Sequence, residues 1–174
     1  SGFNTAVGAV AGTALTTGTQ NTLIGGQAGD ALTTGALNVA VGYGALSTDD
    51  LGSQSVAVGR NALGAQNYAT ATNSLNTAVG YEAGLSVTTG VQNTLIGGQA
   101  GDALTTGNNN VSLGYSSLTA NTKSHNNIAI GVFALNSFNI TTSTDGYNVA
   151  IGSVAGEAVT TGISNTLIGG QSGD

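Results

Sequence analysis

Short apolar runs recur along the whole chain, and a glycine follows each of them. The pentapeptide Asn–Thr/Val–Ala/Leu–Val/Ile–Gly occurs ten times, strictly or with one change. Its copies begin at Asn4, Asn21, Asn38, Ser55, Asn76, Asn93, Asn110, Asn127, Asn148 and Asn165. Runs of three or four apolar residues closed by glycine are too short for helices and are typical of strands that end in tight corners. The pattern therefore predicts ten short β-strands.

The copies follow one another at two fixed spacings. Consecutive copies are offset by 17 in most cases and by 21 after Ser55 and after Asn127. A longer period of 72 also exists, because residues 20–35 are identical to residues 92–107. Internal repeats of this kind form solenoids, in which each repeat buries its apolar surface against the next. We therefore expect an all-β parallel β-solenoid with ten coils, each 17 or 21 positions long, in one domain over residues 1–174.

Each position of the coil, counted from the first residue of the pentapeptide, has its own residue type. Position 4 is a large aliphatic residue and position 8 is Ala or Ser in every coil. Position 5 is always glycine, namely Gly8, Gly25, Gly42, Gly59, Gly80, Gly97, Gly114, Gly131, Gly152 and Gly169. Parallel stacking at about 4.8 Å per coil would bury the position 4 residues in one row and align the position 1 asparagines in an amide ladder.

Position 3 predicts a partner for the coil. Neighbouring strand residues point to opposite faces, so position 3 points away from the position 4 row. It is Leu23, Leu95 and Leu167 in the second coil of each long repeat, and Ala or Ser elsewhere. A strand that is apolar on both faces needs cover from outside its own coil. In a chain with only 6% charged residues, the expected cover is another copy, which predicts a homo-oligomer.

Composition excludes several classes of function. Arg60 and Lys123 are the only basic residues and the net charge is −6, so we expect no nucleic-acid partner. No apolar stretch approaches the length of a bilayer span, and we expect no membrane insertion by this segment. Cysteine is absent, which removes disulfides and thiolate metal sites.

The repeats resemble a known family. The words NTAVG, NVAVG, NIAIG and NVAIG, each with a small residue at position 8, resemble the head repeats of trimeric autotransporter adhesins, the YadA-like heads. The phrases NTAVGYEAG and NVAVGYGAL are similar to repeats of phage tail-fibre proteins. In the adhesin heads such repeats form a left-handed parallel β-roll, and three chains pack into one rod. The resemblance therefore implies a left-handed β-roll assembled as a homotrimer.

The two longer coils carry extra residues around 65–73 and 136–145. They could form a ledge of loops that presents Tyr68, Phe138 and Tyr147 to a glycan or receptor. They could equally adjust the twist of the coils or contact a neighbouring chain. The sequence leaves both interpretations open.

The remaining polar residues give no catalytic, cofactor or metal site. Asp30, Asp102 and Asp174 occupy equivalent turns about four coils apart, too far to share an ion, and we expect solvated carboxylates there. Asp49 and Asp50 are also expected in a solvated loop. His125 is the only histidine, and no oriented nucleophile or acid accompanies it. We expect no enzymatic activity and no cofactor.

These patterns favour a structural function. We expect a piece of a longer extracellular chain, a phage tail fibre of the virion or an adhesin of the bacterial cell surface, that associates with itself and attaches to a cell-surface glycan or receptor. Two alternatives remain open. Thr–Thr doublets near the ends of five coils are compatible with an ice-binding β-solenoid, and the apolar strands are compatible with a self-assembling filament.

Overall fold

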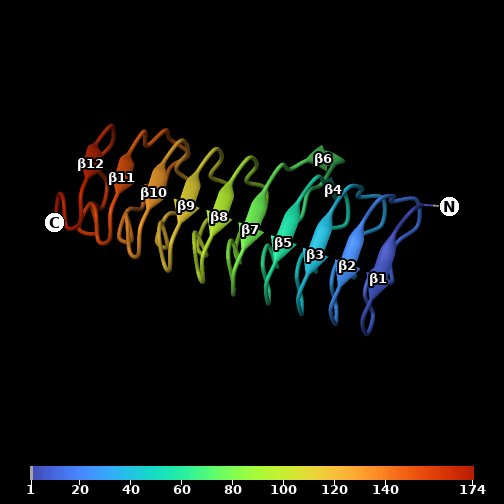
Figure 1. Cartoon of the computed structure of the whole chain (residues 1–174). Coiled ribbons are helices and arrows are strands. Elements are labelled where there is room, and N and C mark those ends of the chain that lie inside the picture. The colour runs from blue at the N-terminus through green and yellow to red at the C-terminus, as the bar shows by residue number, and fades with distance from the viewer. Residues whose placement is uncertain (1) are drawn as a thin grey trace.

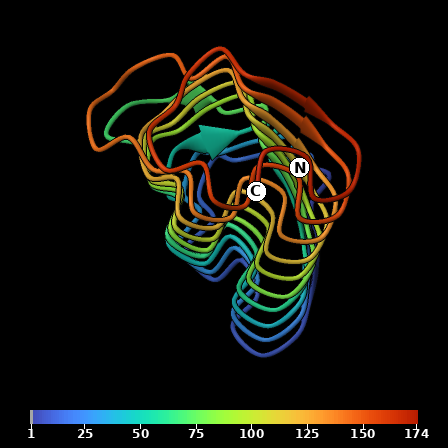
Figure 2. The ribbon, with the colours of Figure 1, turned by 90° about the vertical axis from the view of Figure 1, so that its left-hand side faces the viewer.

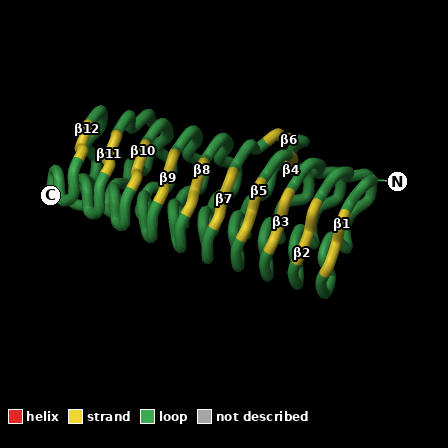
Figure 3. Tube along the Cα trace, viewed as in Figure 1, coloured by secondary structure: helices red, strands yellow, loops and turns green. Residues whose placement is uncertain are grey.

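The computed structural model describes residues 2–174 and confirms a parallel β-solenoid (Figure 1, Figure 3). Its twelve strands are β1 (Thr5–Val7), β2 (Thr22–Ile24), β3 (Val39–Val41), β4 (Gly52–Ser53), β5 (Val56–Val58), β6 (Thr72–Asn73), β7 (Thr77–Val79), β8 (Thr94–Ile96), β9 (Val111–Leu113), β10 (Ile128–Ile130), β11 (Val149–Ile151) and β12 (Thr166–Ile168). Over residues 2–174 the remaining backbone forms turns and loops, with no helix and hence none that could span a membrane.

The strands pair in the order in which they follow one another. A ten-stranded parallel sheet runs β1-β2-β3-β5-β7-β8-β9-β10-β11-β12, and β4 pairs with β6 beside it. Equivalent pentapeptide positions face each other across each pair, as Thr5 faces Thr22 and Ile130 faces Ile151. The chain therefore advances along a rod with its two ends at opposite ends (Figure 1).

The inner and outer faces of the strands are the reverse of those expected. Position 3 points into the coil, where Leu23, Ala40 and Leu95 are fully buried. Position 4 points outward, and Ile24 and Leu113 keep 39% and 42% of their surface exposed. The interior of a coil is too narrow for ten large aliphatic side chains, which explains why Ala or Ser fills position 3 in most coils.

The core explains the four-coil period of the sequence. In the second coil of each long repeat the position 3 residue is leucine, and position 9 of that coil and of the coil before it is glycine. A Cβ atom at Gly12 or at Gly29 would lie 2.7 or 2.8 Å from the methyl groups of Leu23. In the next two coils position 3 is alanine and Leu46 and Leu63 fill position 9, both fully buried. Leucine thus alternates between position 3 and position 9 along the rod, so that the interior stays filled.

Candidate functional site

The asparagines at position 1 form a ladder inside the chain. Oδ1 of Asn93 accepts a hydrogen bond from the backbone N–H of Asn110 at 3.0 Å. Nδ2 of Asn93 donates to the carbonyl of Gly107, in the same coil, at 2.9 Å. The same pair of bonds recurs in most coils, where the asparagines are almost completely buried. Each amide therefore joins two coils and also closes its own coil.

Ser55 breaks the ladder, and a buried polar cluster replaces the missing amide. Nε2 of Gln66 donates to Oγ of Ser55 at 2.8 Å and to Oδ2 of Asp49 at 2.7 Å. Oγ of Ser74 lies 2.5 Å from Oγ of Ser55 and accepts from the backbone N–H of Asn76 at 3.4 Å. The first long coil thus supplies Gln66 and Ser74. They complete the hydrogen bonds that the short side chain of Ser55 cannot make alone.

Asp49 was expected in a solvated loop, and that expectation is wrong. Its side chain is fully buried and accepts hydrogen bonds from Gln66 and from the backbone N–H of Gly52. Burial raises the pKa of the Asp49 carboxyl above its ordinary value of 3.8, although these hydrogen bonds oppose the shift. The carboxyl is a structural group of the core.

The Asp49 carboxyl makes stability depend on pH with a definite sign. Its pKa is higher in the folded chain, so the folded state binds more protons than the unfolded state between the two pKa values. We expect the free energy of unfolding to fall as pH rises above about 4 and through the raised pKa of Asp49. Asp49→Asn should reduce this dependence in urea titrations, whereas Asp174→Asn, at an exposed position, should leave it unchanged. Stability that rises with pH over this range would contradict the assignment.

Two of the three predicted contact residues are buried, which corrects their proposed role. Phe138 is fully buried in a core cluster with Leu118 and Leu135. Tyr68 is 4% exposed, and its hydroxyl donates to the carbonyl of Gly90 at 2.8 Å. Burial raises the pKa of the Tyr68 hydroxyl. Both side chains anchor the long coils and are not presented to a ligand.

Tyr147 is exposed, as expected, beside the second loop. Its hydroxyl donates to Oδ2 of Asp145 at 2.9 Å, and this bond raises the pKa of the Tyr147 hydroxyl. Nδ1 of His125 accepts from the backbone N–H of Asn108 at 2.9 Å, and Nε2 lies 2.7 Å from Oγ of Ser143. Figure 2 shows that this loop, in orange, and the loop of the first long coil, in green, project on the same side of the rod.

The aspartates of the repeated turn are less solvated than expected. Asp30 and Asp102 are half-buried, and one carboxylate oxygen of each is buried without a hydrogen-bond partner. Burial raises the pKa of the Asp102 carboxyl, and the nearby Glu82 carboxylate adds to the shift. Within residues 2–174 no three acidic or histidine side chains come together as metal ligands.

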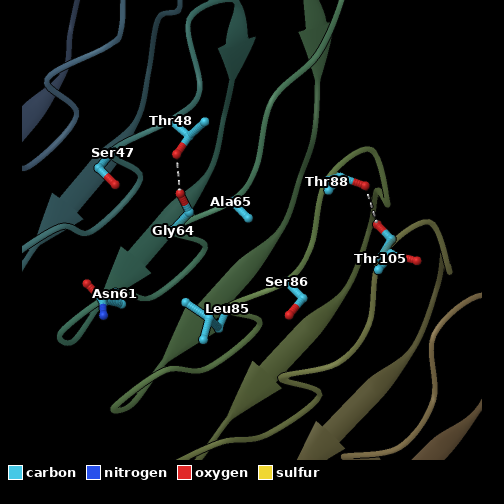
Figure 4. Close-up of a pocket in the computed structure, with 9 residues that line it drawn as sticks. All are labelled: Ser47, Thr48, Asn61, Gly64, Ala65, Leu85, Ser86, Thr88 and Thr105. Atoms are coloured by element: carbon cyan, nitrogen blue, oxygen red, sulfur yellow. Dashed lines mark hydrogen bonds between the residues drawn. The ribbon is translucent and has the colours of Figure 1, made fainter.

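A hollow of about 540 Å³ lies on the outside of the rod (Figure 4). Its lining residues carry no titratable side chain; they are Ser47, Thr48, Asn61, Gly64, Ala65, Leu85, Ser86, Thr88 and Thr105. Oγ1 of Thr48 donates to the carbonyl of Gly64 at 2.6 Å, and Oγ1 of Thr88 donates to that of Thr105 at 3.2 Å. The threonine hydroxyls bind the neighbouring coil, as the hydroxyls of Thr16 and Thr33 also do.

The outward face of the ten-stranded sheet is an apolar row along the whole rod. We call the position 4 side chains the outer row; they are Val7, Ile24, Val41, Val58, Val79, Ile96, Leu113, Ile130, Ile151 and Ile168. Each is exposed or half-buried. Exposed apolar surface of this kind is typical of contact surfaces.

No family model, no curated protein and no solved structure matches the chain.

Proposed function

We propose that the chain is a structural segment of an extracellular fibre or cell-surface adhesin. Three chains form a homotrimer of left-handed β-rolls and attach a virion or a bacterial cell to a receptor-bearing surface. The handedness and the number of chains in this proposal follow the resemblance of the repeats to the heads of trimeric autotransporter adhesins. A rod with three copies of each outer surface gains avidity from contacts that are weak singly.

The outer row is the observation that carries the proposal. Positions 3, 8, 9 and 12 together fill the interior of the coils, so the outward side of the position 4 row is not covered by its own chain. They lie in register on consecutive strands, as Val41 beside Val58 and Ile130 beside Ile151. A continuous apolar surface of this form fits an equal surface on another copy.

The solution mass tests the proposal. Light scattering on the purified chain is expected to give three times the 16.8 kDa mass of one chain. The mass of a single chain at all concentrations would contradict the trimer, and a mass that grows without limit would favour a filament.

Charges placed on the outer row should separate the subunits without unfolding the coils. Ile24→Glu with Leu113→Glu leaves the interior unchanged, because both side chains point outward. We expect the mass to fall to that of one chain while the circular dichroism spectrum is retained. Thr89→Glu, at an exposed site away from the strands, is the control and should keep the mass of the parent. Association that survives the double change would contradict this interface.

A further inference from the structure

Three tyrosines form a second surface feature, separate from the loops and the outer row. Tyr43, Tyr81 and Tyr115 occupy position 6, directly after the position 5 glycine, in the third, fifth and seventh coils. Their side chains are 54%, 48% and 51% exposed. We call these three side chains the tyrosine row.

Backbone hydrogen bonds hold the tyrosine row in register. The carbonyls of Tyr43 and Tyr81 accept from the N–H groups of Asn61 and Gln99, in the next coil, at 2.9 and 2.8 Å. The carbonyl of Arg60 between them accepts in the same way from Glu82. Successive tyrosines are therefore two coils apart, which corresponds to about 9.6 Å along the rod.

Each tyrosine ring is supported by the position 6 residue of the preceding coil. A Cβ atom at Gly26 would lie 3.3 Å from Cδ2 of Tyr43, and one at Gly98 would lie 3.5 Å from Cδ2 of Tyr115. Arg60 takes this place for Tyr81, with its guanidinium carbon 5.6 Å from the ring centroid. Each ring therefore lies against the preceding coil, and a ring restricted in this way before a ligand arrives loses less entropy on binding.

The spacing and chemistry of the row select a ligand class. A tyrosine ring offers an apolar face and a hydroxyl at its edge, the two features that match the C–H face and the hydroxyl groups of a sugar ring. The two-coil spacing is close to the two-sugar repeat of an extended β-1,4-linked polysaccharide, so that every second sugar could meet one ring. A chain with a net charge of −6 and two basic residues favours a neutral polymer over an anionic one.

We propose that the tyrosine row is a binding platform for an extended, neutral β-1,4-linked polysaccharide. The three rings stack on alternate sugars, and the rigid backbone between them sets the spacing. This inference adds a ligand class to the proposed attachment function and depends only on the rings being accessible in the assembled protein.

Retention on insoluble polysaccharides tests the platform. The assembled protein is expected to bind microcrystalline cellulose or chitin and to pass through insoluble starch, whose α-linkages do not present the same straight repeat. Tyr81→Ala, which removes the central ring, should weaken binding about tenfold, and the triple alanine variant at 43, 81 and 115 should not be retained. Phe3→Ala removes an aromatic side chain that is 82% exposed and off the row, and should bind like the parent.

Light scattering on the same variants separates this proposal from the fibre proposal. An unchanged mass for the triple variant, with binding lost, supports the platform. Failure of the parent to bind cellulose or chitin, or equal binding by the triple variant, would overturn it. A lower mass for the triple variant would also overturn it, because the row would then be a contact between subunits. If the parent protein were a monomer and still bound through the tyrosine row, the homotrimer would be contradicted and the polysaccharide platform would stand.

Discussion

Replacing Gly97 by alanine is expected to destabilise the solenoid by about 4 kcal/mol, the largest loss among the predicted variants. Gly97 is at position 5, with φ at +133°, and a Cβ atom there would lie 2.6 Å from the carbonyl carbon of Gly114. The obstacle is backbone of the next coil, which cannot move without opening the sheet. Urea unfolding followed by circular dichroism measures the loss.

The adjacent glycine provides a matched control. Gly98 lacks the left-handed backbone conformation, and a Cβ atom there would make an ordinary contact with the Tyr115 ring. Gly98→Ala should change the free energy of unfolding by less than about 1 kcal/mol. Equal effects of Gly97→Ala and Gly98→Ala would show that the close approach between the position 5 glycines of neighbouring coils does not determine the stability of the solenoid.

Asn93→Ala should have the second largest effect, a loss of about 3 kcal/mol. The change leaves the carbonyl of Gly107 and the N–H of Asn110 buried without the Asn93 amide that binds them. The amide also accepts from Nδ2 of Asn110, so the change removes two side-chain hydrogen bonds between neighbouring coils and one within a coil. Thermal and urea unfolding of the variant measure the effect.

Asn67→Ala is the control for the ladder, because Asn67 is an exposed asparagine. It should be neutral within about 0.5 kcal/mol. If Asn93→Ala were as mild, the ladder would be a consequence of stacking and not one of its causes.

The strands could be predicted from the sequence because glycine and the aliphatic residues mark the same positions in every coil. The direction in which their side chains point could not be settled by alternation alone. Alternation within a three-residue strand allows two assignments, and a shift of one residue exchanges the two faces. The deciding fact is the width of the interior, where Ala40 and Ala57 fit and a valine or isoleucine in every coil would not.

Three buried side chains in and beside the long coils were missed for a different reason. Asp49, Gln66 and Phe138 all occupy position 12, where Leu32 and Leu104 are core residues of other coils. Extending the register beyond the pentapeptide would have placed the three side chains inside. The sequence around Asp49 is polar, and the expectation of a solvated loop followed local composition. The substitution of Ser55 for asparagine was the visible signal that the ladder needed other partners there.

The alternation of leucine and glycine in the core also limits how such a rod can evolve in length. Loss of the fifth coil alone would bring Leu63 against Leu95, and loss of the second coil alone would leave Gly12 facing Ala40. Duplication of four coils preserves the alternation of leucine and glycine, and residues 20–35 recur unchanged as residues 92–107. Rods related by unequal recombination should therefore differ in reach by steps of about 19 Å, the rise of four coils.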